Sequence, residues 1–164
     1  MSRLGIIEGI NEINEIKLKE AGVYSLEDLL QTCISRKGRN DLAEKTGITE
    51  KVILKWANQV DLARIKGIGG EYAELLEAAG VNTVPELTKR NPDNLRVKMM
   101  ELNNAKKMVK KLPARRQVED WIRQAVKLPR TLQYEYLSSN FHYFVFAAFV
   151  MIRLAVKAAI SLER

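Results

Sequence analysis

The chain repeats one pattern of apolar residues and glycines 58 positions apart, and this repeat restricts its possible folds more than any other feature. The two copies are IEGINEINEIKLKEAGVYSLEDL at residues 7–29 and IKGIGGEYAELLEAAGVNTVPEL at residues 65–87, and they align without a gap. A pattern that recurs at a fixed interval indicates one supersecondary unit used twice. We therefore expect two similar groups of helices that share a core, because neither short helix pair buries enough surface alone.

Each copy has the sequence signals of two short helices in succession. Two glycines stand thirteen positions apart, a spacing that suits about three helical turns closed by a left-handed glycine. A capping box follows in both copies, SLED at residues 25–28 and TVPE at residues 83–86, so a second helix begins there. The paired glycines are Gly9 and Gly22 in the first copy and Gly67 and Gly80 in the second.

Two further helices are predicted between the copies. Gly47 ends the first of them, Thr49 caps the second, and Trp56 in the second falls at a spacing that we expect to face the core. The same spacing is that of a helix-turn-helix, in which the second helix would read DNA. A core role for Trp56 and a DNA-reading helix are both kept as interpretations.

The rest of the chain up to about residue 130 also favours helices. Asn91 and Pro92 begin a helix that can run to Leu112, and a helix containing Val118, Trp121, Ile122 and Ala125 ends before Pro129. No strand pattern is present. The predicted fold class is all-α, with short helices and short connections.

Positive charge is concentrated in one part of the chain. The net charge is +7, but residues 1–60 hold nine basic and nine acidic side chains, whereas residues 89–130 hold thirteen basic and four acidic ones. Such a region attracts phosphates if a good fraction of its side chains share one face. A solvated helix surface explains the same composition, so both interpretations stay open.

The second glycine turn has the residues needed to bind a phosphate. Glycines permit positive φ and leave backbone N–H groups open beside the positive end of the following helix. Lys66 adds a charge next to Gly67, Ile68, Gly69 and Gly70. The first turn has Asn11 and Glu8 at the matching positions, so we expect it to be mainly structural. A second turn that only packs its two helices is the alternative.

These residues carry a resemblance to a known family. The I-x-G-I-G turns, the helices ending in A-G-V and the closing segment QVEDWIRQAVKLPR resemble helix-hairpin-helix motifs and, in their order, the family catalogued as domain of unknown function 4332. The resemblance spans residues 4 to about 136. Related helix-hairpin-helix modules mostly bind DNA without reading its sequence, so the resemblance implies nucleic-acid contact at one remove.

The last part of the chain is apolar in a way that the rest is not. Residues 141–152 are interrupted only by His142, and twelve helical residues rise about 18 Å, less than a bilayer core. We predict a domain at residues 1–136 and an apolar helical tail at residues 137–164 that mediates self-association, binds a protein partner or contacts a membrane surface. The candidate partner-binding residues are Phe141, Phe144, Val145, Phe149 and Ile152.

Catalytic, metal-binding and cofactor-binding signatures are not found in the sequence. With one Cys, one His and no secretory signal, we expect a cytoplasmic protein with no cofactor and no enzymatic activity. Three functions remain: a sequence-nonspecific nucleic-acid-binding module that contacts DNA, an assembly or scaffold subunit, and an undetected enzyme. The candidate nucleic-acid-binding residues are Lys66, Gly67, Ile68, Gly69, Gly70, Lys106, Lys107, Lys110, Lys111, Arg115 and Arg116.

Overall fold

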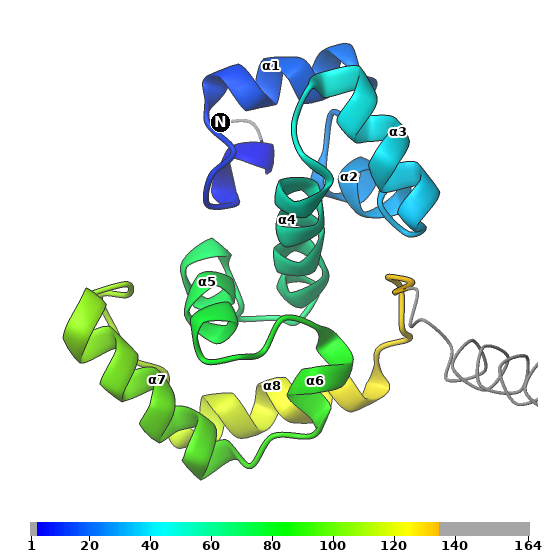
Figure 1. The fold of residues 1–164 in the computed structure, drawn as a ribbon. Coiled ribbons are helices and arrows are strands. Elements are labelled where there is room, and N and C mark those ends of the chain that lie inside the picture. Colours follow the sequence, from blue (N-terminus) through cyan, green and yellow to red (C-terminus); the bar gives the residue numbers. More distant parts are fainter. Residues whose placement is uncertain (1–2, 135–164) are drawn as a thin grey trace, which may run out of the picture. The chain divides into compact units, whose positions relative to one another are not determined.

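The computed structural model describes residues 3–134, and every element in that range is a helix (Figure 1). The predicted all-α fold class is therefore confirmed for this part of the chain. The predicted apolar tail and its candidate partner residues lie outside the described residues. The elements are a 3-10 helix η1 (Arg3–Ile6) and the α-helices α1 (Glu12–Glu20), α2 (Leu26–Thr32), α3 (Arg36–Thr46), α4 (Glu50–Ala63), α5 (Gly70–Ala78), α6 (Val84–Thr88), α7 (Pro92–Lys106) and α8 (Arg115–Lys127).

The two sequence copies fold alike. α1 and α5 are nine residues long, and each follows a turn in which one glycine has positive φ: 89° at Gly9 and 93° at Gly67. Each helix also ends before a glycine with positive φ, as the spacing predicts. The predicted caps are formed as well, because the side chains of Ser25 and Thr83 accept hydrogen bonds from backbone amides three residues on. We call residues 7–11 the first turn and residues 65–69 the second turn.

The structural repeat is longer than the sequence repeat. α4 and α8 each place a tryptophan in the core, Trp56 at 2% exposure and Trp121 at 1%. A Cβ on Gly9 would lie 3.2 Å from Trp56 Nε1, and one on Gly67 would lie 3.0 Å from Trp121 Nε1. Each tryptophan therefore packs beneath the glycine turn of its own copy. The prediction that Trp56 is a core residue is confirmed.

α7 is shorter than predicted. The sequence allows a helix up to Leu112, but the helix ends at Lys106 because Lys107 adopts a left-handed conformation with φ 53°. The buried side chain of Asn103 then takes the place of helical hydrogen bonds: it accepts from Val109 N and donates to Val109 O. Residues 107–114 form a loop between α7 and α8 instead of a last helical turn.

α4 is the central helix of the described unit and does not present a free DNA-reading face. It packs against α2, α3 and α5, and its buried residues are Ile53, Trp56, Ala57, Gln59, Val60, Asp61 and Leu62. With these three neighbours, the exposed residues of α4 are Lys51 and Val52 in its first turn, so the helix lacks a continuous exposed face with which to enter a groove. The helix-turn-helix interpretation is therefore not supported.

The second copy surrounds α5 with basic segments. α5 packs against α7, and the two run in opposite directions: Arg90, just before α7, donates to Gly80 O at the end of α5, while Tyr72 in the first turn of α5 donates to Lys111 O at 2.8 Å. α8 packs against α6 and α7 (Figure 1). The basic region of the sequence thus borders both ends of α5.

Candidate nucleic-acid interface

The second turn has one position that requires glycine for its backbone conformation. Gly67 has positive φ, but Gly69 is the N-cap of α5 in an extended conformation, with φ −96° and ψ −175°. Only Gly67 therefore requires glycine for its backbone angles. The expectation that both glycines use positive φ is wrong for Gly69, whose role is that of a cap without a side chain.

Ile68 does not belong to the interface. Its side chain is 4% exposed, and its N–H donates to Ile65 O at 3.0 Å. Neither the side chain nor the amide can reach a ligand. These observations do not support the sequence prediction that included Ile68 among the contact residues, because the turn directs this side chain into the core between its two glycines.

The second turn is fastened to α8 by one glutamine. Gln124 Oε1 accepts the N–H of Lys66 at 2.9 Å, and Gln124 Nε2 donates to Lys66 O at 3.3 Å and to Asp120 Oδ2 at 2.8 Å. The backbone amide of Lys66 is therefore already used. Its side chain is exposed and, within the described part of the chain, makes no ion pair, so it remains available to an anion. Sequence analysis missed Gln124, because nothing in the repeat indicates which residue of α8 meets the turn.

The amino end of α5 is open where that of α1 is closed. The side chain of Asn11 caps α1 by accepting the N–H of Asn14 at 2.9 Å. Gly69 occupies the matching position before α5 and makes no side-chain cap. The first amides of a helix have no partner within it, and they carry the positive end of the helix dipole. The second turn therefore lacks the side-chain cap that the first turn has, while Gly70, the first residue of α5, packs against the backbone of Ile6, whose carbonyl oxygen would lie 2.0 Å from a Cβ at that position.

The loop after α7 and the start of α8, which are both rich in basic residues, lie next to this helix end. The hydrogen bond from Tyr72 to Lys111 O places that loop against the first turn of α5. Gln117 Nε2 would be 3.7 Å from a Cβ on Gly67, so the start of α8 lies at the second turn. The exposed cations in or next to these segments in the sequence are Lys66, Lys110, Lys111 and Arg116, which we call the turn-side cluster.

The remaining predicted cations belong to the end of α7 and to the start of α8. Lys106 and Lys107 are exposed at the end of α7, before the loop. Arg115 is engaged: it pairs with Asp93 and, at 2.6 Å, with Glu119. Its hydrogen bond to Asp93 lowers the pKa of that carboxyl and raises the pKa of the guanidinium. Arg115 therefore connects α8 to α7, and a phosphate would have to compete with Asp93 and Glu119 for its guanidinium.

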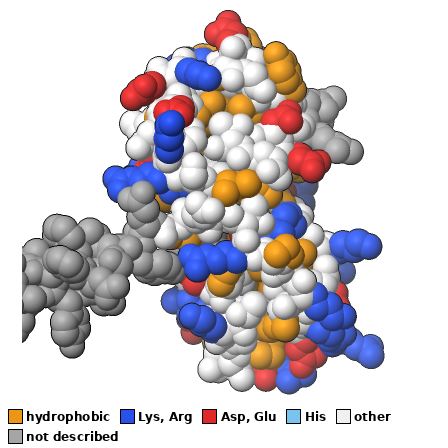
Figure 2. Space-filling view, turned by 90° about the vertical axis from the view of Figure 1, so that its right-hand side faces the viewer, with side chains coloured by type: hydrophobic (Ala, Val, Ile, Leu, Met, Phe, Trp, Pro, Cys, Tyr) orange, Lys and Arg blue, Asp and Glu red, His pale blue; other side chains and the backbone are white. Residues whose placement is uncertain are grey.

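The surface charge follows the same division. On the face seen in Figure 2, Lys and Arg side chains are more frequent over the lower half, where α5 to α8 lie in Figure 1, than over the upper half. One acidic side chain, Glu71, stands in the first turn of α5 and is exposed. A carboxylate there opposes an anion at the helix end.

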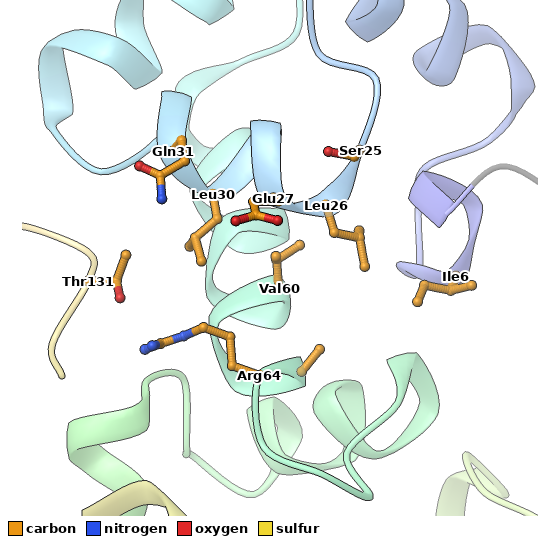
Figure 3. A pocket seen from close by; sticks show the side chains of 10 residues that line it. Ile6, Ser25, Leu26, Glu27, Leu30, Gln31, Val60, Arg64 and Thr131 are labelled. Atoms are coloured by element: carbon orange, nitrogen blue, oxygen red, sulfur yellow. The ribbon is translucent and has the colours of Figure 1, made fainter. Parts of the chain in front are cut away.

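One pocket of the described unit lies away from these cations. It has a volume of about 670 Å³ between η1, α2 and α4, and Figure 3 shows its apolar side chains Ile6, Leu26, Leu30 and Val60 with Arg64 extending toward Thr131. Arg64 already donates to Pro129 O at 3.1 Å and pairs with the buried Asp61 at 2.6 Å. This pocket therefore has no free cation aimed into it.

The described residues include a buried cysteine and no group of side chains placed to bind a metal ion. Burial raises the pKa of the Cys33 thiol to about 12, which keeps it protonated and unreactive at neutral pH. No group of His, Cys, Asp and Glu side chains in residues 3–134 is placed to hold a metal ion. Within the same residues, no helix has the length and apolar character needed to cross a bilayer.

The comparison with known proteins agrees with the resemblance seen in the sequence. A family model described as Domain of unknown function (DUF4332) matches residues 8–128, which include the second turn, all but the first residue of the first turn, and all but the ends of the described unit. No curated protein and no solved structure matches the chain. Function therefore has to be argued from the geometry of this chain.

Proposed function

The chain belongs to the family described as Domain of unknown function (DUF4332), and we propose its function from the geometry of the candidate interface. The chain is a non-enzymatic module that binds the phosphate backbone of nucleic acid, in particular DNA, without reading its base sequence. Its two glycine turns correspond to helix-hairpin-helix motifs, and only the second contacts phosphate. The observation that supports this proposal is the uncapped amino end of α5 beside exposed Lys and Arg side chains.

The proposed contact combines two weak anion-binding elements into one site. Open helix amides donate to a phosphate oxygen and the helix dipole favours its charge. The turn-side cluster adds side-chain charge from three different segments. A phosphate bound at this site would accept hydrogen bonds from the backbone amides and would be surrounded by the side chains of the turn-side cluster. This arrangement suits a nucleic acid, whose backbone charge is the same at every nucleotide whatever its base sequence.

Sequence-independent binding follows from the kinds of contact available. Backbone amides and the cations of the turn-side cluster recognise phosphates, which are the same at every nucleotide. Base recognition would need a helix or strand that enters a groove. The helix that the sequence offered for this purpose, α4, is packed on three sides.

The first test is the salt dependence of binding to a duplex of arbitrary sequence. If four to six phosphates are neutralised, log K should fall against log salt concentration with a slope of roughly −4 to −5. Fluorescence anisotropy with a labelled random duplex at several salt concentrations measures this slope, and a second unrelated sequence should give the same affinity. No binding at low salt, or affinity that does not change with salt, would refute the proposal.

The second test moves the cap of the first turn into the second. Gly69→Asn should lower duplex affinity about tenfold, because the new side chain would occupy the N–H of Tyr72 as Asn11 occupies that of Asn14. Nothing lies within 4 Å of a Cβ at Gly69, so thermal stability should be unchanged or slightly higher. The reciprocal change Asn11→Gly is the matched control and should cost stability while leaving affinity within about twofold. Equal losses of affinity in both variants would contradict the assignment of binding to the second turn.

A role as an assembly subunit is the second candidate, and exposed apolar residues of the first copy favour it. Ile13 and Ile16 on α1 are 65% and 57% exposed and share one face of that helix. Ile6 is half exposed at the rim of the large pocket. A protein partner would cover such side chains. This role is compatible with nucleic-acid binding, because the two surfaces belong to different copies.

A further inference from the structure

The opposite end of α5 has a second basic depression. It has a volume of about 310 Å³, and its floor is formed by the buried side chains of Ala79 and Leu95. The rim is polar and exposed, and it includes no carboxylate. The rim residues are Lys89, Arg90, Asn91, Asn94 and Lys98.

The cations of this rim are held close together. Arg90 Nη2 and Lys98 Nζ lie 3.9 Å and 4.0 Å from the position of a Cβ on Gly80, so the two nitrogens are no farther apart than the sum of these distances. Arg90 donates to Gly80 O, which satisfies a carbonyl at the end of α5. Lys89 and Lys98 form no ion pair with any described acidic residue. Like charges at this separation repel, and a bound anion removes that repulsion.

The amides of α7 do not contribute to this depression. The side chain of Asn91 accepts hydrogen bonds from the N–H groups of Asp93 and Asn94, at 3.0 Å and 3.1 Å, and so closes the amino end of α7. Recognition there depends on side-chain charge, with the exposed side chain of Asn94 as a further hydrogen-bonding group. A tetrahedral oxyanion that accepts several hydrogen bonds fits such a rim better than a flat apolar ligand does.

We propose that this depression is a second phosphate-binding site, formed by Lys89, Arg90 and Lys98, and that it holds a backbone phosphate of the same nucleic acid that binds at the second turn. This inference extends the proposed function. α5 connects the two sites, and nine helical residues at about 1.5 Å each separate them by roughly 14 Å. One free phosphate cannot reach both, whereas a nucleic acid can. The two sites together select a polyanion over a small anion.

The test removes the two free lysines and compares them with two lysines of the first copy. Lys89→Gln/Lys98→Gln should lower affinity for a random duplex several-fold at low salt and should make the salt slope shallower by about 0.9, which corresponds to one lost phosphate contact. Lys45→Gln/Lys51→Gln removes the same charge from exposed positions of α3 and α4. Arg90 is left unchanged because it bonds to Gly80 O. Anisotropy across a salt series gives both slopes, and equal slopes for the two double variants would overturn the inference.

The same measurements separate this site from the second turn. If Gly69→Asn binds normally and Lys89→Gln/Lys98→Gln does not, the depression binds phosphate and the second turn does not. If only Gly69→Asn loses affinity, the depression is not a phosphate site and the proposed function stands without it.

A titration with inorganic phosphate, followed by the NMR chemical shifts of the backbone amides, tests the depression in the absence of nucleic acid. If the full chain binds no duplex, but phosphate shifts the amides of Asn91, Asn94 and Lys98, the site takes free phosphate and the proposed function fails. If the chain binds neither duplex nor phosphate there, this inference is wrong. The double variant serves as the control, since its amides should not respond.

Discussion

Replacing Gly67 with Ala should destabilise the protein by about 2–4 kcal/mol, one of the two largest effects that we expect from single substitutions. Two costs add at this position. The backbone has φ 93°, which residues with a side chain rarely adopt. The new Cβ would also lie 3.0 Å from Trp121 Nε1, an atom of a fully buried ring that cannot move without disturbing the core. Urea unfolding followed by tryptophan fluorescence measures the change.

Substitutions at two other glycines separate the two contributions to this loss of stability. Gly22 has φ 90° and nothing within 4 Å of its Cβ position, so Gly22→Ala should show the backbone cost alone, about 1–2 kcal/mol. Gly69 has ordinary angles and open space, and Gly69→Ala should cost less than about 1 kcal/mol. If Gly67→Ala and Gly22→Ala destabilise equally, the contact with Trp121 does not constrain the turn.

A double-mutant cycle tests the contact directly. Trp121 Nε1 is buried with no hydrogen-bond partner in the described structure, and a phenylalanine would lack this atom. Gly67→Ala combined with Trp121→Phe should therefore cost less than the sum of the single changes. Strict additivity would contradict direct packing of the indole against the turn.

Much of the fold could be predicted because its signals are local. The 58-residue repeat, the glycines that end α1 and α5, and the side-chain caps of α2 and α6 each depend on residues within one or two turns of a helix. The end of α7 was missed for the opposite reason. It is fixed by Asn103 binding both backbone groups of Val109, a contact that a helical pattern continuing to Leu112 does not reveal.

The pairing of each tryptophan with its turn could not be found by one alignment. Trp56 and Trp121 are 65 positions apart, whereas the turns are 58 apart. Extra residues in α7 and in the loop after it displace α8 along the sequence but not in the fold. A comparison of α4 and α8 by themselves would have shown the match, since Ile53 and Val118, three residues before each tryptophan, are both fully buried.

The candidate site was predicted in part, because sequence shows charges but not their partners. Arg115 and Arg116 are neighbours that carry the same charge, and the sequence does not distinguish them. In the structure, however, Arg115 pairs with Asp93 and Glu119. Lys111 belongs with the second turn only because Tyr72 binds its carbonyl. The basic cluster at the far end of α5 likewise forms because α5 and α7 pack against each other in opposite directions. Counting charges along the sequence does not reveal this packing.

Replacement of the buried Arg39 should have an effect at least as large as that of Gly67→Ala. Arg39 is 3% exposed, and its Nη1 donates to Cys33 O at 2.9 Å and to Gln133 O at 3.2 Å, while Nε donates to Glu50 at 3.0 Å. Removing the guanidinium leaves carbonyl groups and a carboxylate without their donor. We expect Arg39→Met to cost about 3–5 kcal/mol in urea unfolding, although it fills a similar volume.

Conservative variants separate the hydrogen bonds of Arg39 from its charge. Arg39→Lys keeps the charge but cannot reach both carbonyls and Glu50, so it should recover less than half of the loss. Glu50→Gln keeps an acceptor and removes the ion pair; because Glu50 is partly exposed, we expect a cost of about 1 kcal/mol or less. Lys37→Met on the exposed side of α3 controls for the added methionine and should be nearly neutral.

Cys33 supplies a second readout for Arg39, because it is the single cysteine and lies at the same corner. Its thiol is fully buried, and burial raises its pKa to about 12, so a thiol reagent at neutral pH reacts only when the α2–α3 corner opens. Arg39→Met should speed labelling of Cys33 about a hundredfold, the factor that corresponds to a loss near 3 kcal/mol. Labelling at the parental rate in a destabilised variant would show that Arg39 supports another part of the fold, and parental stability together with parental labelling would show that its hydrogen bonds contribute little.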